Sequence, residues 1–355
     1  GRAGGDFSAL PRPLICPHEN LAVAMAHGHA LVTGRAQAAM VHVSVGTANM
    51  VCGAMNAARD NIPILLSAGR TPVTEEGPHG TRSRFIHWAQ EMFDQAGVLR
   101  EAVKWDYEIR NGEQVEDGLA RALEVAMAPP AGPVYLSLPR EMLAETVRAE
   151  RPDRRPTPAA PQAPDANAID RLAARIRAAE APVIVTANAG RDHAAVGLLA
   201  TLAERWAVAV IEFNPRVVNL PADHPMHLGY ETGTALGDAD LIVALSVDVP
   251  WVPSVTRPRP TAAMVEIGVD PLHTRYPMRS FPADLSIAAD SALTLEALAE
   301  AVGAKMKGAA AAIEKRRAIL SERSSVLQAS WRAASGPREG AITPEHISAC
   351  VAEAV

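Results

Sequence analysis

The chain has 355 residues, of which 48% are hydrophobic and 21% charged, a composition typical of a soluble globular protein with two or three domains. A net charge of −6 gives no electrostatic footprint for nucleic acid, and no apolar run is long enough to cross a bilayer, so we expect neither nucleic acid nor membrane as a partner. The three cysteines, Cys16, Cys52 and Cys350, are widely spaced and form no CxxC motif, which indicates free thiols and a cytoplasmic location.

Apolar segments and helical segments rich in small residues alternate over residues 13–143. Helices of this spacing between strands predict a parallel sheet with right-handed crossovers, and we assign residues 1–146 to the first domain. The polar residues 70–87 form a long loop after a strand, a common place for function. Within it, Thr81-Arg-Ser-Arg84 is either a binding site for an anionic substrate or coenzyme, or simply a solvated loop. We expect strands at residues 13–16, 38–45, 62–68 and 133–138, and helices at 19–33, 47–59, 91–96 and 113–126.

Five prolines between residues 147 and 167 predict a semi-rigid, extended linker. Residues 168–306 alternate again and predict a Rossmann-like domain. Its first turn after a strand, Asn188–Arg191, lacks GxGxxG, which weakens the case for a dinucleotide. Residues 307–355 read as a linker and the start of a truncated further domain. The predicted strands are 182–187, 208–213, 240–247 and 263–269, and the predicted helices are 170–179, 194–205, 293–302 and 313–327. The predicted fold is therefore α/β, with two doubly wound parallel-sheet domains and a third one missing.

Glu19 follows the first predicted strand and lies in the first turn of the helix behind it. Ligands of open α/β sheets bind outside the carboxyl ends of the strands, which favours a functional role for this carboxylate. The alternative is a stabilising charge at a helix N-terminus.

Ordered motifs around Glu19 resemble those of thiamine-diphosphate-dependent enzymes of the decarboxylase and acetolactate synthase group. They are His18-Glu19-xx-Ala22, Gly46-Thr47-x-Asn49, Asn56-Ala-Ala-Arg-Asp60-xx-Pro63 and Gly132-Pro-Val-Tyr-Leu-Ser137, followed later by His224-Pro-xxx-Gly229 and Ile267-Gly-Val-Asp-Pro271. The resemblance implies that residues 1–146 form the pyrimidine-binding domain and residues 168–306 the central domain. Within the family, the pattern resembles benzoylformate decarboxylase and the acetolactate synthase large subunit.

The resemblance also implies roles for individual residues. Glu19 becomes the acid that activates the cofactor through N1′ of its aminopyrimidine, and burial among alanine and valine is expected to raise its pKa. His42 handles protons during decarboxylation, unless it is a buried histidine satisfied by backbone groups. Gln90 lies in the substrate region. The expected cofactor-binding residues are Pro17, Glu19, Gly46, Thr47 and Asn49, although Asn49 is equally suited to cap a helix.

The implied reaction is decarboxylation of a small 2-oxo acid, ligation of the resulting two-carbon-type intermediate, or both, as in acetolactate synthase. One alternative is a simple decarboxylase of the benzoylformate type, although Trp251-Val252-Pro253 stands where that group carries a second histidine. Another alternative is a non-catalytic homologue that binds a nucleotide such as FAD or ADP in the central domain. No sequence motif supports this alternative.

The family holds Mg²⁺ and the diphosphate through a Gly-Asp-Gly motif in a third domain. The only similar run is Gly237-Asp238-Ala239, at the start of a predicted strand, and we identify no metal ligand in the chain. Thiamine diphosphate and Mg²⁺ are therefore expected to need the missing domain, and this chain alone is expected to be inactive. The family's active site lies between subunits, which implies a homodimer or tetramer.

Overall fold

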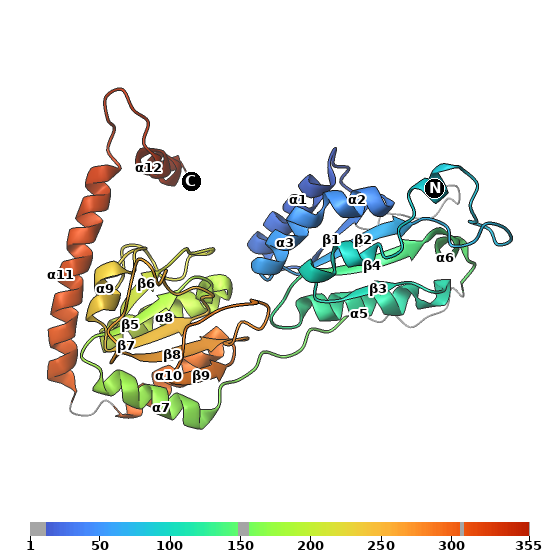
Figure 1. Ribbon diagram of the computed structural model, residues 1–355. Helices are drawn as coiled ribbons and strands as arrows, with labels where there is room; N and C mark the ends of the chain where they lie inside the picture. The colour runs from blue at the N-terminus through green and yellow to red at the C-terminus, as the bar shows by residue number, and fades with distance from the viewer. Residues whose placement is uncertain (1–11, 148–155, 306–308, 355) are drawn as a thin grey trace. The chain divides into compact units, whose positions relative to one another are not determined.

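The computed structural model describes residues 12–147, 156–305 and 309–354, and the chain divides into two compact units, residues 1–160 and 161–355 (Figure 1). Each unit is an α/β structure built on a parallel sheet, which confirms the predicted fold class. Most of the predicted linker, residues 148–155, lies outside the described residues, and residues 156–165 contain no helix or strand. The predicted linker would end at residue 167, but the first helix of the second unit already begins at Ala166.

The sheet of the first unit has the strand order β1-β2-β4-β3, and every neighbouring pair is parallel. The strands are β1 (Gln37–Val41), β2 (Ile64–Arg70), β3 (Asp106–Glu108) and β4 (Val134–Pro139). The helices are α1 (Glu19–Thr33), α2 (Val43–Asn49), α3 (Val51–Arg59), α4 (Ile86–Ala89), α5 (Val115–Met127) and α6 (Arg140–Ala144), with 3₁₀ turns at Ala96–Val98, Arg100–Ala102 and Gly112–Gln114.

Both faces of this sheet are buried, because successive side chains of a strand point to opposite faces. On β2, Ile64 and Leu66 pack with α1 and α3, whereas Leu65 between them packs with α5. The helices thus cover the sheet from two sides (Figure 1). This double cover explains why the strands are almost continuously apolar and why they were predictable.

Several predicted elements of the first unit need correction. Residues 13–16 form no strand. The strand predicted to reach residue 45 ends at Val41, because Val43 adopts a φ of 34°, outside the extended region. The helix predicted at 47–59 is two helices, α2 and α3, which meet at the fully buried Met50. The helix predicted at 91–96 is not formed, since α4 ends before it, at Ala89, and the next 3₁₀ turn begins at Ala96.

The second unit has the strand order β6-β5-β7-β8-β9, again with all pairs parallel. The order reverses beside β5, as in doubly wound folds. The strands are β5 (Pro182–Thr186), β6 (Ala209–Glu212), β7 (Leu241–Leu245), β8 (Ala263–Gly268) and β9 (Leu285–Ala288). The helices are α7 (Ala166–Ala178), α8 (His193–Trp206), α9 (Gly233–Asp238), α10 (Ser291–Lys305), α11 (Ala310–Ala334) and α12 (Pro344–Ala354), with a 3₁₀ turn at Ala189–Arg191.

Helix α11 packs on the second unit, although its residues were predicted to belong to a linker after residue 306. Ile313 joins the core formed with α7, α8 and α10. Arg316 is buried, and its guanidinium donates to the backbone oxygens of Ala179 and Trp206, both at 2.7 Å. The first half of α11 is therefore an integral part of this unit. Among the described residues, no helix is long and apolar enough to cross a membrane.

Candidate functional site

Glu19 opens α1 and is partly exposed at the rim of the first unit. His18 caps the helix, because its Nδ1 accepts from the backbone N–H of Asn20 at 3.1 Å. The Glu19 carboxylate therefore has its position fixed by a well-formed helix start. The amide of Asn49, at the end of α2, donates to Glu19 Oε2 at 3.0 Å. Two residues that the sequence motifs singled out are thus in direct contact.

The pKa of Glu19 is lower than its ordinary value, and the predicted rise is not found in this structure. The main cause is a hydrogen bond from the residue's own backbone N–H, and the second is the hydrogen bond from Asn49. Desolvation acts in the opposite direction but is outweighed, and His18 and His42 lower the pKa further. Burial was expected from the small apolar residues of α1, but these face the sheet while Glu19 remains at the open end of the helix.

Gly46 leaves room for the close approach of α2 to β1 and to the Glu19 carboxylate. A Cβ atom added to Gly46 would meet Val41 Cβ at 2.8 Å and Glu19 Oε1 at 3.4 Å. The glycine thus allows the buried first half of α2 to lie against the end of β1, with the Glu19 carboxylate close by.

His42 directly follows β1, at the carboxyl end of the sheet, and its side chain is exposed. The alternative of a buried histidine satisfied by backbone groups is therefore wrong. The next residue, Val43, has a φ of 34°, which a β-branched residue rarely adopts. Such a backbone conformation costs about 1–3 kcal/mol and is concentrated at functional sites. The strain here turns the chain from strand into helix within one residue.

Gln90 ends α4 and lies next to the start of α2, because its backbone oxygen accepts from Ser44 Oγ at 2.8 Å. The structure therefore brings Gln90 close in space to His42, which is two residues before Ser44. Pro17 is exposed and directly precedes the cap of α1. Glu19, Asn49, His42, Gln90 and Pro17 thus belong to one edge of the first unit.

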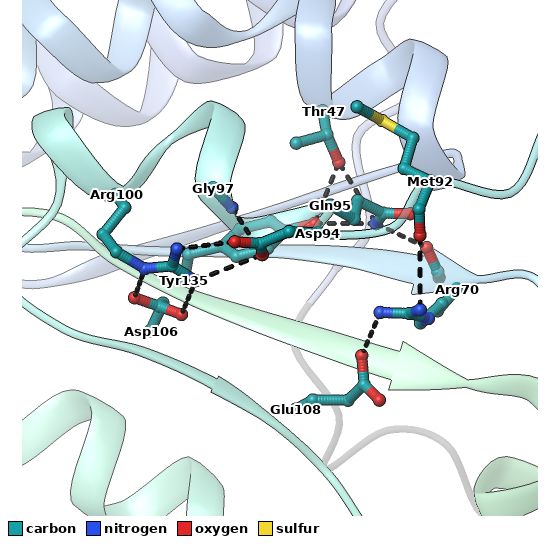
Figure 2. A network of polar contacts seen from close by, with 11 residues as sticks. Thr47, Arg70, Met92, Asp94, Gln95, Gly97, Arg100, Asp106, Glu108 and Tyr135 are labelled. Carbon is teal, nitrogen blue, oxygen red and sulfur yellow. Dashed lines mark hydrogen bonds and ion pairs between the residues drawn. The ribbon is translucent and has the colours of Figure 1, made fainter.

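Thr47 lies elsewhere. It is fully buried, and its hydroxyl donates to the backbone oxygen of Val43 at 2.8 Å and lies 2.9 Å from Tyr135 Oη. The amide of Gln95 donates to Tyr135 Oη at 2.8 Å and to the backbone oxygen of Gly69 at 3.0 Å. Figure 2 shows this network, which links Thr47 of α2, Tyr135 of β4 and Gln95. A ligand would have to displace these bonds to reach the Thr47 hydroxyl.

The same network anchors the loop that carries Gln90. Arg70, the last residue of β2, donates to Glu108 Oε2 at 2.7 Å and to the backbone oxygen of Met92 at 3.4 Å (Figure 2). Arg100 bridges Asp94 and Asp106, at 2.6 and 3.1 Å. No sequence motif marked these residues as a group. The charged side chains that pair with one another are close in space, but they come from different strands and turns.

The first turn of the second unit, Ala189–Arg191, lies where a Rossmann-like domain would bind a dinucleotide. Gly190, whose N–H would be a natural phosphate donor, instead donates to the buried Oδ1 of Asn219 at 3.0 Å. The following helix, α8, is capped by the carboxylate of Asp192, which accepts from Ala194 N–H at 2.9 Å. An internal amide and a negative charge thus occupy the place where a dinucleotide would put its pyrophosphate. These residues do not fit such a cofactor.

Within the described ranges, no three His, Cys, Asp or Glu side chains gather where they could hold a metal ion. A hollow of about 330 Å³ is present between α1 and α3, lined in part by Asn20, His27, Asn56 and Asp60. Asn20, the neighbour of Glu19, lines this hollow, but Glu19 itself does not. His27 pairs with Asp60 across it at 3.1 Å.

The contact between Asn49 and Glu19 leads to a pH prediction. Replacing Asn49 by alanine is expected to raise the Glu19 pKa toward 4.5, because one of its two main hydrogen bonds is lost. A carboxyl whose pKa is depressed on folding stabilises the fold above its unfolded pKa, and that stability is lost as pH falls through the folded value. Asn49→Ala should therefore weaken the pH dependence of stability in acid. Carboxyl ¹³C NMR titration measures the pKa, with exposed Asn56→Ala as the control, and an unchanged Glu19 pKa would contradict the assignment.

Two sequence profiles match the chain. The profile described as thiamine pyrophosphate enzyme, N-terminal TPP binding domain, covers residues 7–98. The profile described as thiamine pyrophosphate enzyme, central domain, covers residues 169–298. The matches fall in the first and second units, respectively, in the order that the sequence motifs predicted.

Several curated proteins are similar to the chain. Benzoylformate decarboxylase of Pseudomonas aeruginosa is 28% identical over 333 residues, which cover 89% of this chain and 60% of that protein. Sulfoacetaldehyde acetyltransferase of Rhodobacter capsulatus is 26% identical over 304 residues, covering 82% and 49%. The large subunit of acetolactate synthase isozyme 1 of Escherichia coli is 24% identical over 268 residues, covering 73% and 46%. The chain thus spans about half to three fifths of the length of these relatives.

A solved structure of the thiamine diphosphate-dependent 4-hydroxybenzoylformate decarboxylase of Rhodococcus jostii is also similar. It superimposes with a TM-score of 0.65 at 25% identity, over 81% of this chain and 54% of that one. The resemblance inferred from the motifs is confirmed by the profiles and by these relatives.

Proposed function

Because this chain belongs to the thiamine pyrophosphate enzymes, and contains the family's N-terminal and central domains, we propose that it provides the aminopyrimidine-binding half of a 2-oxo acid decarboxylase. The reaction releases CO₂ from the 2-oxo acid. The remaining fragment is then transferred to an acceptor, as in acetolactate synthase, or released as an aldehyde, as in a simple decarboxylase.

The observation that carries the proposal is the position of Glu19. Its carboxylate lies at the open end of α1, over Gly46 and in contact with Asn49, at the edge where ligands of parallel sheets bind. The residues fit a cofactor whose aminopyrimidine ring needs a carboxyl partner, since the Glu19 carboxylate is partly exposed there and is held in place by Asn49. Thiamine diphosphate supplies, when bound, a nucleophilic carbon that attacks the 2-oxo group and accepts the electrons released with CO₂.

In this proposal, Glu19 holds a proton at the ring nitrogen N1′. The chain alone keeps the Glu19 pKa low, which favours the ionised form. A covering domain would exclude water from the carboxylate and raise its pKa into the range that proton exchange with a weakly basic nitrogen requires. Asn49 positions the carboxylate through its hydrogen bond. Association with further protein is thus what would make Glu19 an effective acid.

His42 and Gln90 are proposed to face the substrate. His42 is exposed at the carboxyl end of β1, where its imidazole is accessible to a bound substrate. Gln90 lies beside it through the contact with Ser44 and offers an amide for a carbonyl or carboxylate oxygen. Pro17 and Gly46 would shape the backbone around the aminopyrimidine ring.

The diphosphate and Mg²⁺ are proposed to bind to a further domain, because the relatives extend well beyond the length that this chain covers. We also propose that the active site forms between subunits of a homodimer or tetramer. A simple benzoylformate-type decarboxylase remains the second proposal, supported by the 28% identity to such an enzyme. Flavin or ADP binding in the second unit is not favoured, since Asn219 already occupies the Gly190 N–H.

The test is purification of the native protein that contains this chain, followed by mass spectrometry of the bound cofactor and a CO₂-release assay. Thiamine diphosphate should be found, and CO₂ should be released from pyruvate or a larger 2-oxo acid. Acetolactate formed from pyruvate would support the ligating reaction, and benzaldehyde formed from benzoylformate would support the simple one. A flavin spectrum without CO₂ release from any 2-oxo acid would contradict the proposal.

A further inference from the structure

Positive charge is concentrated where β2 and β4 end, and the reaction described above does not use it. Arg82, Arg84 and His87 follow β2, and Arg140 opens α6 after β4. The pKa of His87 is lower than its ordinary value, first because the ring is desolvated and then because Arg140, Arg84 and Arg82 disfavour its charged form. Glu141 acts in the opposite direction. The geometry agrees, because the backbone N–H of His87 donates to the backbone oxygen of Arg84 at 3.0 Å, and His87 and Arg140 both contact Ser83.

Arg82 already has partners within the protein. It forms an ion pair with Glu91, its Nε donates to the backbone oxygen of Pro72 at 2.9 Å, and its guanidinium lies 5.2 Å from the centre of the Trp88 ring. This residue therefore stabilises the loop, and its charge is largely neutralised.

Arg84 and Arg140 differ from Arg82. Both are exposed, and among the described residues neither pairs with a carboxylate. Within the parts of the chain that the structure describes, Arg140 Nη1 donates to the hydroxyl of Ser83 at 3.4 Å. Glu141 does not neutralise them, because its carboxylate is buried and accepts from the Thr74 backbone N–H at 2.8 Å and from the Thr74 hydroxyl at 2.7 Å. Two positive charges thus remain available to a ligand.

His87 adds a directed donor. Its Nδ1 accepts from the backbone N–H of Ser83 at 3.1 Å, so the neutral ring carries its proton on Nε2. A hydrogen-bond donor on Nε2 beside two guanidinium groups suits an anion, which Arg binds with two parallel hydrogen bonds where geometry allows.

The cluster lies on the same edge of the sheet as the candidate site. Pro139 pairs with Arg70 on β2, and Val41 pairs with Ala68 on the same strand, so Arg140 and His42 leave the sheet at the same end. They are separated laterally by two strand spacings, about 10 Å. His87 lies in α4, which ends at Gln90 in contact with the start of α2.

We propose that Arg84, Arg140 and His87 form a subsite for a second anionic group of the substrate, at the end away from its 2-oxo acid function. This inference rests on the proposed function and deepens it by naming a substrate class, 2-oxo acids that carry a terminal carboxylate, phosphonate or sulfonate. Of the two interpretations of Thr81-Arg-Ser-Arg84, anion binding is the one that these contacts favour.

The first test is binding and needs no turnover. Glutarate, inorganic phosphate and sulfate are added to the 355-residue chain at constant ionic strength, and the His87 ring proton, identified by its loss in His87→Asn, is titrated by NMR. At least one anion should raise the His87 pKa, because a bound anion favours the imidazolium, and which anion acts distinguishes a carboxylate from a tetrahedral group. Arg84→Gln and Arg140→Gln should weaken that anion's binding by roughly ten- to hundredfold, whereas Arg121→Gln, an exposed arginine on α5, should not. No response to any anion beyond that to chloride, or equal loss in Arg121→Gln, would overturn the subsite.

The second test separates the subsite from the proposed function. The native protein that contains this chain is assayed with 2-oxoglutarate and 2-oxovalerate, which have the same chain length and differ in the terminal carboxylate. A ratio of kcat/KM that favours the diacid and collapses in Arg84→Gln and Arg140→Gln supports the subsite. Turnover of both acids with an unchanged ratio in the variants refutes it and leaves the proposed function standing. Anion binding at His87 without turnover of any 2-oxo acid supports the subsite and refutes the decarboxylase.

Discussion

Replacing Glu19 by glutamine is expected to lower kcat/KM of the native protein that contains this chain by about 10²- to 10⁴-fold. Glutamine keeps the size of the side chain and can still accept from Asn49, but it cannot hold a proton that exchanges with the aminopyrimidine. The loss should therefore appear mainly in turnover. Steady-state CO₂ release from the preferred 2-oxo acid measures it.

Glu116→Gln is the matched control, since Glu116 is also an acidic residue in the first turn of a helix of the same unit. Both variants lose one helix N-terminal charge, so their thermal unfolding should change in the same direction and by a similar amount. If Glu19→Gln is as active as Glu116→Gln, the carboxylate serves only the helix, and the proposed role of Glu19 is wrong.

Replacing Gly190 by alanine is expected to destabilise the second unit by about 3 kcal/mol or more. The new Cβ would overlap the carbonyl oxygen of Val218 and lie 2.9 Å from its carbon. Relief would require the backbone to move, and the bond from Gly190 N–H to Asn219 would then be lost. Because Asn219 also donates to Glu212 at 2.9 Å, a buried network would be disturbed.

Gly197→Ala is the matched control, because the same substitution is expected to stabilise the second unit instead of destabilising it. Gly197 is exposed in the middle of α8, and nothing lies within 4 Å of an added Cβ. Alanine there should stabilise the unit by about 0.5–1 kcal/mol, because glycine is the poorer helix former. Urea unfolding followed by the fluorescence of Trp206, Trp251 and Trp331 measures both. A Gly190→Ala protein as stable as Gly197→Ala would contradict the close packing at this turn.

The elements that the sequence predicted well are those buried on both sides. The apolar run at residues 62–68 was expected as a strand, and β2 occupies Ile64–Arg70. Two strands, β3 and β9, were not predicted, and their sequences differ from that apolar pattern. β3 has only three residues, Asp-Tyr-Glu, and β9 alternates between buried and exposed positions at one edge of its sheet. Short or half-exposed strands depend on the neighbour with which they pair, and that neighbour is distant in the sequence.

The candidate site was predictable in part for the same reason. The positions of Glu19 and His42 at strand and helix ends follow from local patterns. The pKa of Glu19 does not, because it depends on an amide 30 residues away and on whether another surface covers the carboxylate. Thr47 was grouped with the cofactor by its motif, yet its hydroxyl meets Tyr135, 88 residues further along the chain. Such contacts have no local signal.

Helix α11 has 25 residues, so it is about 37 Å long at 1.5 Å per residue. Arg316 holds the first half of the helix through its hydrogen bond to the backbone. Further along, Ser324 donates to the backbone oxygen of His224 at 3.3 Å, and the side chain of Leu327 lies next to Gly229. A helix held at several points along its length is a rigid part of the unit on which it packs. The segment that begins at Ser335 is therefore held about one helix length away from the start of α11.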